Sequence, residues 1–331
     1  MNFVPSSTHL TVAIAADNAD KALALARTLP PQVSLVEYRL DIMATVDIPL
    51  LAARTPVPAI FTCRPRSQGG HFSGPETERR AILREALATS HYVDIEMETL
   101  PHLANAIRIP GRVIGSHHNF SGMLHHWEDL AQRIRALGAG IVKLVGMATS
   151  ERDALPPLAW LAQARYPAIA IAMGEPGLAT RLLAPRFDHA FLTFAAAGRN
   201  TAPGQLNVHE FSELYGFARI ARAAPLVVML TPAPAPWQTI RAYRQALAAS
   251  CGPDAWLLPL PTQTLSAELL RTLRLARVAT LVRLPQVDIT SDLRAYDIEP
   301  AGYAWHLADS SAPLLEPPTP RTLLTFLAQG A

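Results

Sequence analysis

Eight short apolar runs, separated by segments with helical patterning, are the feature that most constrains the fold of this chain. Each run has the length and composition of a buried strand, and "ETERRAILREALA" (76–88) is one of the helical segments between them. Eight alternations of strand and helix over roughly 220 residues are typical of a (β/α)8 TIM barrel. Their number and even spacing favour the barrel over a doubly wound sheet. The runs occupy residues 9–16, 33–40, 57–63, 92–97, 112–118, 140–145, 167–173 and 189–195.

The chain is longer than one barrel requires. It has 331 residues, and only three of its 17 glycines come after Ala224, so the composition changes near that position. We therefore predict an α/β protein with a barrel domain at 1–222 and a smaller α/β domain at 223–331. The second domain is expected to run strand, helix, strand, helix and strand, at 226–231, 237–250, 255–260, 264–275 and 278–284.

Composition and charge narrow the possible partners. The net charge is only +2 and no basic run occurs, so nucleic acid is not an expected partner. We find neither a signal-peptide pattern nor an apolar stretch of ~18 residues free of charge and proline, so no membrane association is expected. Cys63 and Cys251 are the only cysteines and lie far apart, which fits a reducing, cytoplasmic setting.

Polar and large side chains gather at the C-terminal ends of the predicted strands. In a barrel these ends meet at one face, where active sites are built. Glu37 and Arg39 are two residues apart, so they point to the same side of their strand. The residues at these ends are Glu37, Arg39, Arg64, Glu96, His118, Lys143, Met173 and Phe194.

Lys143 interrupts the apolar run "GAGIVKLVGMA" (138–148). An unpaired ammonium in a buried strand is costly. Either the lysine reaches water from the strand end, or the site uses a neutral amine whose pKa burial lowers. His118 ends the preceding strand, and an amine beside an imidazole suits imine chemistry, in which lysine attacks a ketone and histidine moves protons. A class I aldolase would place its lysine in the same way, so the pair alone leaves the reaction open.

Three further segments carry polar candidates. "MGEPGLATRLLAPRF" (173–187) places Arg181 near a helix start, where it is either a carboxylate clamp or a solvent-exposed arginine. "AAAGRNTAPGQL" (195–206) is a small-residue loop suited to a lid. "SHHNF" and "LHH" (116–126) contain four histidines, but neighbours on a strand point to opposite faces, so we expect no metal site and place His117 outside the barrel.

These motifs, in this order, resemble the type I 3-dehydroquinate dehydratases, the Schiff-base family of the shikimate pathway, from about residue 9 to 222. The matching stretches are "VEYRLD", "TCRPRSQGGHFSG", "SHHNF", "VKLVGM", "MGEPGLATR" and "TFAAAGRNTAPGQ". The resemblance implies cofactor-free dehydration of 3-dehydroquinate, with Lys143 forming the imine and His118 as general acid and base. It also implies a homodimer, because family members are often dimers. The substrate contacts that it implies are Glu37, Arg39, Arg64, Met173, Arg181, Phe194, Thr201 and Gln205.

The chain departs from the family pattern at two positions. Thr201 stands where serine is usual, which keeps the hydroxyl. Gln68 stands where the family usually has a glutamate that pairs with the catalytic histidine. Glutamine can hydrogen-bond His118 but cannot stabilise an imidazolium by charge. Two alternatives therefore stay open: another class I Schiff-base lyase or aldolase, and a non-catalytic paralogue that binds a shikimate-pathway metabolite.

The C-terminal region resembles a degraded substrate-binding half of shikimate dehydrogenase. The similar stretches are "PLVVMLTPAPAPW" (225–237), "WLLPLPTQTLSAELLRTLR" (256–274) and "ATLVRLPQV" (279–287). The family's Ser-x-Ser falls on Ala233 and Ala235, and its catalytic lysine falls on Val287. No stretch resembles the nucleotide-binding half with its Gly-rich loop, so we expect no dehydrogenase activity.

Overall fold

The computed structural model of the chain describes most of the two predicted regions. Contacts between Cα atoms divide the chain into two compact units, one of Met1–Ala184 and Asp188–Leu214, the other of Pro185–Phe187 and Tyr215–Ala331. The predicted architecture, a barrel followed by a smaller α/β unit, is confirmed. The described residues are 8–197, 202–220, 226–232, 237–251, 254–284, 286–290, 293 and 304–306.

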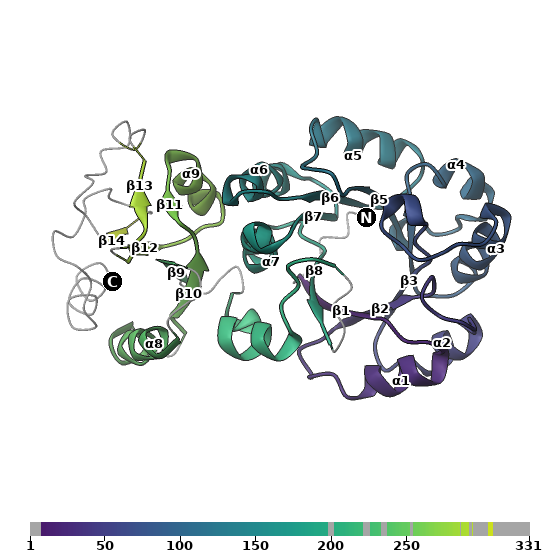
Figure 1. The fold of residues 1–331 in the computed structure, drawn as a ribbon, viewed down its shortest axis with the longest axis horizontal. Helices are drawn as coiled ribbons and strands as arrows, with labels where there is room; N and C mark the ends of the chain where they lie inside the picture. The colour runs from purple at the N-terminus through teal and green to yellow at the C-terminus, as the bar shows by residue number, and fades with distance from the viewer. Residues whose placement is uncertain are drawn as a thin grey trace. The chain divides into compact units, whose positions relative to one another are not determined.

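The first unit is built on eight parallel strands, which lie where the apolar runs predict them (Figure 1). The strands pair in the order β7-β6-β5-β4-β3-β2-β1-β8. A parallel bridge between Ala168 and Ala190 joins the two ends of this series and closes the barrel. The strands are β1 (His9–Ile14), β2 (Leu35–Arg39), β3 (Ala59–Thr62), β4 (Tyr92–Glu96), β5 (Val113–Asn119), β6 (Ile141–Met147), β7 (Ala168–Met173) and β8 (Leu192–Ala196).

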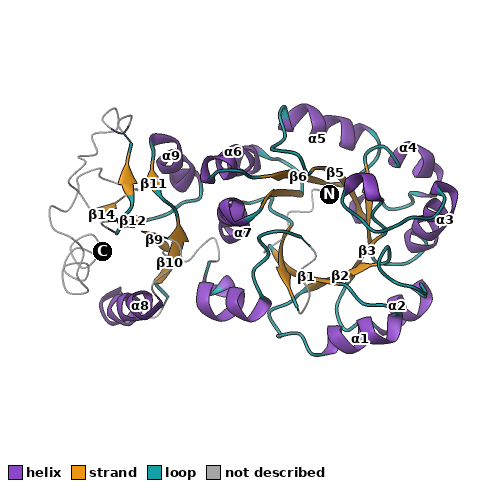
Figure 2. Cartoon of the chain, in the orientation of Figure 1, coloured by secondary structure: helices purple, strands orange, loops and turns teal. Residues whose placement is uncertain are grey.

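Helices follow the barrel strands and surround them as an outer layer (Figure 2). Local sequence explains their ends: Asn18 caps α1 by accepting from Lys21 N at 3.0 Å, and α5 has Glu128 in its first turn and Arg135 in its last, which complements the helix dipole. Within the described residues no helix is both long and apolar enough to cross a membrane. The helices are α1 (Ala19–Arg27), α2 (Ile48–Arg54), α3 (Glu76–Leu87), α4 (Leu100–Leu103), α5 (Trp127–Ala136), α6 (Leu155–Gln163) and α7 (Leu178–Leu183), and a π-helix (Glu210–Tyr215) follows β8.

The barrel interior is layered, because alternate residues of each strand point inward. An aliphatic floor fills the N-terminal half, and its buried members include Leu35, Ile60, Ile114, Ile141 and Ile169. Two residues further along each strand, the inward positions become mostly polar. They are Glu37, Thr62, Ser116, Lys143 and Ile171, of which all but Ser116 line a pocket in the C-terminal half of the barrel.

The second unit has a four-stranded sheet in the order β10-β9-β12-β14, in which β14 (Ala304–His306) runs antiparallel to β12. Ser266 caps α9 by accepting from Leu269 N at 3.2 Å. The five predicted elements of this region are present, but the second helix begins at Ala267 after its cap Ser266, and residues 264–265, predicted as helix, form a short strand. Ala233 and Ala235 lie outside the described residues. The other elements are β9 (Leu226–Thr231), α8 (Trp237–Cys251), β10 (Trp256–Pro261), α9 (Ala267–Leu275) and β12 (Thr280–Arg283), with a separate pair of β11 (Thr264–Leu265) and β13 (Asp288–Ile289).

Candidate active site

A pocket opens at the C-terminal ends of the barrel strands. It contains every site residue predicted from the sequence that the structure describes, while Thr201 lies outside the described residues. The strand-end argument accounts for this convergence, because parallel strands bring these ends to one face. The predicted residues that line the pocket are Glu37, Arg39, Arg64, Gln68, His118, Lys143, Met173, Arg181, Phe194 and Gln205.

Lys143 lies on β6 at the bottom of the pocket and is only 5% exposed. The alternative in which it reaches water from the strand end is therefore wrong. Its Nζ donates a hydrogen bond to Asp94 Oδ2 at 2.7 Å and lies 3.8 Å from Glu37 Oε1. The ring of Phe194 covers the amine, with its centroid 4.9 Å from Nζ. The amine is buried but paired, and it faces the pocket.

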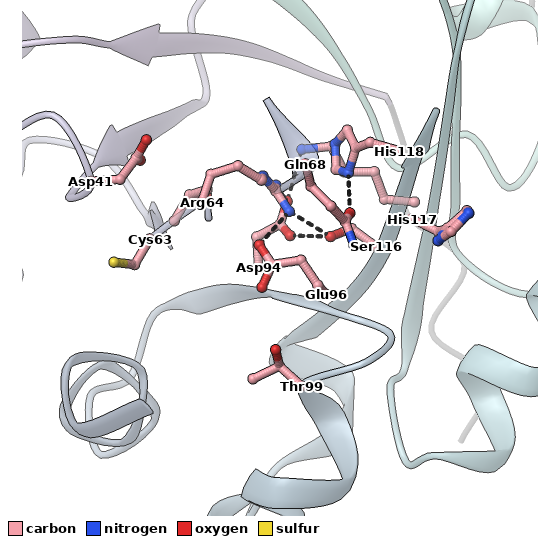
Figure 3. Close-up of polar contacts among 12 residues, drawn as sticks. Asp41, Cys63, Arg64, Gln68, Asp94, Glu96, Thr99, Ser116, His117 and His118 are labelled. Carbon is pink, nitrogen blue, oxygen red and sulfur yellow. Dashed lines mark hydrogen bonds and ion pairs between the residues drawn. The ribbon is translucent and has the colours of Figure 1, made fainter. Parts of the chain in front are cut away.

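Asp94, which sequence analysis did not identify, is the central anion of the site (Figure 3). Besides the bond from Lys143, it forms an ion pair with Arg64 Nη2 at 2.7 Å, and Ser116 Oγ donates to its Oδ1 at 2.6 Å. Burial opposes ionisation of Asp94, but the charges of Arg64 and Lys143 outweigh it and hold the pKa of Asp94 well below its ordinary value. The carboxylate is therefore charged at neutral pH.

Glu96 holds Arg64 from the other side. Its Oε1 accepts from Arg64 Nη1 at 2.8 Å, and its Oε2 accepts from Arg79 Nη1 at 2.6 Å. Arg79 comes from α3, is fully buried, and also pairs with Glu76 at 2.7 Å. Asp94 and Glu96 are two apart in "YVDIEM", and this period was a signal that both carboxylates face the barrel interior. No local pattern pointed to Arg79.

Two residues of β2 form another wall of the pocket. Glu37 accepts from Thr62 Oγ1 at 2.7 Å. Arg39 makes a two-pronged contact with Asp41, at 2.9 Å from Nε and 2.7 Å from Nη2. Asp41 also accepts from the backbone N–H of His71 at 2.9 Å. These bonds hold both predicted side chains in fixed positions beside the pocket.

His118 is the penultimate residue of β5, and its ring stacks on Phe120 with the centroids 6.2 Å apart. Its Nδ1 lies 3.2 Å from Gln68 Oε1, so the predicted contact between these side chains is present. Loss of hydration, and then the positive charges of Arg64 and Lys143, lower the pKa of His118 well below its ordinary value. The imidazole is neutral at pH 7 and can accept a proton.

Arg181 lies on α7 and is 2% exposed, so the interpretation as a surface arginine is wrong. Its Nη2 donates to Pro203 O at 3.3 Å, while the buried Nε and Nη1 have no hydrogen-bond partner within the described part of the chain. Burial lowers the pKa of Arg181 to about 10. A buried guanidinium with two unused donors is a ready site for a carboxylate.

Of the predicted lid, residues 195–197 and 202–206 are described. Gly174 N, just after β7, donates to Pro203 O at 3.2 Å, and Ala202 N donates to Gln205 Oε1 at 3.2 Å. Gly204 has φ +69°, a conformation that side chains rarely adopt. These contacts hold the loop over the pocket beside Arg181.

The histidines of "SHHNF" separate as the strand period predicts. His118 lines the pocket, whereas the Nδ1 of His117 lies 3.3 Å from Glu98 Oε1. Among the residues described, no group of three or more histidine, cysteine or acidic side chains is placed to hold a metal ion.

Fold and site together define a (β/α)8-barrel protein whose C-terminal mouth holds an amine, an imidazole and a partly unpaired guanidinium in one pocket. The family model described as type I 3-dehydroquinase matches residues 10–222. The chain therefore belongs to the type I 3-dehydroquinase family.

Named relatives show the same similarity. The bifunctional 3-dehydroquinate dehydratase/shikimate dehydrogenase of Arabidopsis thaliana, a chloroplast protein, is 31% identical over 233 residues. The match covers 66% of this chain but only 38% of that protein, so the chain spans less than half of it. The 3-dehydroquinate dehydratase of Methanothrix thermoacetophila is 32% identical over 200 residues, which are 60% of this chain and 87% of the relative.

Solved structures extend the likeness in fold. The type I 3-dehydroquinate dehydratase of Clostridium difficile is 24% identical with a TM-score of 0.54, and the alignment covers 63% of this chain and 90% of that one. The dehydroquinate dehydratase and shikimate dehydrogenase structure from S. pombe is 20% identical with a TM-score of 0.51. It covers 91% of this chain and 62% of that chain, so the similarity of fold extends into the second unit, as the sequence resemblance predicts.

Proposed function

We propose that this chain is a cofactor-free hydro-lyase that dehydrates 3-dehydroquinate to 3-dehydroshikimate. The observation that carries the proposal is the pair of unused donors on buried Arg181, which lines the same pocket as Lys143 and His118. The substrate has a ketone for the amine and a carboxylate for the guanidinium. Both relatives described above are named for this dehydration.

The reaction begins when Lys143 adds to the ketone and water leaves, forming a protonated imine. Before attack the amine must lose a proton, and neutral His118 accepts it and then returns it to the hydroxyl that leaves as water, so the imidazole is neutral again. Asp94, 2.7 Å from Nζ, then stabilises the positive charge that the imine nitrogen carries. The carboxylate that pairs with buried Lys143 in the free protein therefore also stabilises the imine intermediate.

His118 next removes a proton from the carbon beside the imine, and the electrons of that C–H bond move into the imine to give an enamine. The enamine returns its electrons, the C–O bond breaks, and the imidazolium protonates the leaving hydroxyl to form water. Hydrolysis of the remaining imine releases the product and restores the amine. Arg181 holds the substrate carboxylate throughout, so the ring is oriented over Lys143.

The remaining pocket residues suit the rest of the substrate. Glu37 and Arg39 present polar groups to ring hydroxyls, while Met173 and Phe194 contact the ring faces. Thr201 and Gln205 belong to the lid. An aldolase substrate without a carboxylate would leave Arg181 unpaired, and for this reason we prefer the dehydratase.

Borohydride trapping tests the proposal, because the chain contains only two lysines, Lys21 and Lys143. Reduction in the presence of 3-dehydroquinate should inactivate the protein and leave one adduct on the Lys143 peptide. Lys143→Ala should bind ligand without turnover, whereas Lys21→Ala, at an exposed position of α1, should behave as the native chain. An adduct on another amine, or turnover by Lys143→Ala, would refute the imine. Binding without turnover by the native chain would support the non-catalytic alternative.

A further inference from the structure

A second carboxylate stands behind Gln68. Glu98 lies two residues beyond the end of β4, and its Oε2 accepts a hydrogen bond from Gln68 Nε2 at 2.7 Å. The other end of the same amide, Gln68 Oε1, lies 3.2 Å from His118 Nδ1. The amide of Gln68 therefore connects a carboxylate to the imidazole of the pocket.

The chemistry of Glu98, Gln68 and His118 decides which group donates and which accepts in each of the two hydrogen bonds. An ionised carboxylate can only accept, so the NH₂ end of Gln68 must face Glu98 and its carbonyl must face the imidazole. A carbonyl also only accepts, so Nδ1 of His118 must carry the proton. In a neutral imidazole the lone pair is then on Nε2, because Nδ1 is the nitrogen that faces Gln68. Nε2 is the nitrogen left to act as base.

The side chain of Glu98 is ionised at neutral pH, as its role as an acceptor requires. His117, whose Nδ1 lies 3.3 Å from Glu98 Oε1, lowers the pKa of Glu98, and the bond from Gln68 adds to the effect. The side chain of Glu98 is 54% exposed, so it keeps most of its hydration while it orients the amide. The carboxylate therefore acts at short range, through one hydrogen bond, rather than as a distant charge.

We infer that Glu98 is a positioning residue for His118, acting through Gln68: it sets the orientation of the amide and thereby the tautomer of the imidazole. It also places a negative charge one amide away from the ring, where a glutamate at position 68 would place it directly. The inference rests on the proposed function only for its kinetic consequence. The tautomer is a property of the folded chain alone.

Spectroscopy tests the tautomer without any substrate. In the full-length chain labelled with ¹⁵N-histidine, His118→Asn identifies the signals of this ring. We expect the native protein to show the form protonated at Nδ1. Glu98→Lys presents a donor in place of an acceptor, so the amide should turn round and His118 should shift to the form protonated at Nε2. Glu98→Gln, which can donate or accept, should give a mixture.

Kinetics test the consequence. Glu98→Lys should lose on the order of a hundredfold in kcat because Nε2 no longer has its lone pair. Glu98→Gln should lower kcat by only about threefold, with little change in KM, because the carboxylate that it removes is partly exposed to water. The pH profile of kcat reports the same ring, which Arg64, Lys143 and Asp94 face from the pocket and His117 adjoins on its own strand. Glu85→Gln removes an exposed carboxylate of α3 and should change neither signal nor rate.

A double substitution separates positioning from a general loss of charge. Gln68→Glu alone places a second carboxylate beside that of Glu98. The two compete for one proton, so the increase in kcat should be small. Adding Glu98→Gln should then raise kcat by about threefold, the reverse of its effect beside Gln68. A folding defect caused by Glu98→Gln would lower kcat in both backgrounds, so it could not produce this reversal.

The outcomes are distinct. An unchanged His118 tautomer in both Glu98 variants would overturn the inference, as would a native kcat in Glu98→Lys despite a changed tautomer. A changed tautomer in a chain that never turns over 3-dehydroquinate would support the positioning of His118 by Glu98 and refute the proposed function instead.

Discussion

At the scale of single residues, the active site buries charged side chains, and their removal from water opposes folding. Asp94, Arg64 and Glu96 are buried and satisfy one another, so their removal from water is offset by direct ion pairs. Arg181 is different, because two of its buried donors have no partner among the described residues. A group that is satisfied only by a ligand should weaken the free protein and strengthen the complex.

Replacement of Arg181 should therefore separate stability from function. We expect Arg181→Met to raise the free energy of unfolding by about 1–3 kcal/mol, since a desolvated charge is removed. The same change should lower kcat/KM at least ~100-fold through loss of the carboxylate contact. Thermal unfolding and steady-state kinetics measure the two effects. Arg84→Met, at an exposed position of α3, is the matched control, and a destabilised but fully active Arg181→Met would contradict this account.

The acid limb of the pH–rate profile should report His118. Its pKa is lowered, so the neutral base persists below pH 6.5 and is lost only as the pH falls through the lowered value. We therefore expect the acidic midpoint of kcat/KM to lie below 6.5. A midpoint at or above 6.5 would mean that burial of the ring and the cations near it do not control the protonation of His118.

At the scale of elements, the loop after β8 approaches the backbone after β7 closely at Gly204. A Cβ on Gly204 would lie 2.3 Å from the carbonyl oxygen of Gly174, and Gly204 also has φ +69°. Both features disfavour a side chain at this position. The loop can then reach Arg181 only while this position remains glycine.

Gly204→Ala should destabilise the present loop conformation by about 1–3 kcal/mol and so displace the described part of the loop. We expect kcat/KM to fall roughly tenfold or more, with a small change in Tm, because the barrel core is untouched. Gly111→Ala is the control, since a Cβ there meets nothing within 4 Å. Equal effects of the two substitutions on kcat/KM would show that the loop contact is unimportant.

At the scale of the whole molecule, the second unit is a small α/β layer with its own core. Buried side chains from its sheet and from α8 pack together, among them Val227, Met229, Ile240, Leu247 and Leu257. Val287 is fully buried and stands where the resemblance places a catalytic lysine. We propose that this unit contributes structure rather than a second reaction.

The purified chain should not reduce 3-dehydroshikimate with NADPH. A nicotinamide site normally needs a βαβ unit with a Gly-rich turn, and the three glycines after Ala224 are far apart in sequence. Ala233 and Ala235 also lack side chains that could bind substrate hydroxyls. The absorbance of NADPH measures turnover, and titration measures binding. Addition of a shikimate dehydrogenase to the same mixture is the positive control, and any turnover before that addition would contradict the prediction.

The sequence by itself determined the strands, the helices that follow them, and the face on which the pocket residues gather. These features are local, since an apolar run with strand length and a two-residue period specifies an inward face, and parallel strands deliver their ends to one side. Lys143, His118 and Arg181 could be placed at the mouth for that reason. The family resemblance then supplied their roles, which remain predictions.

Tertiary structure alone decided the partners of those residues. The contact of Lys143 with Asp94 joins positions 49 apart, and Arg79 reaches Glu96 from a helix, so neither pair has a local signal. The choice between an exposed and a buried Arg181 was also left open, because the helix pattern does not say what covers it. Such pairs depend on strand register and side-chain direction once the barrel has closed, and these arise only when distant segments meet.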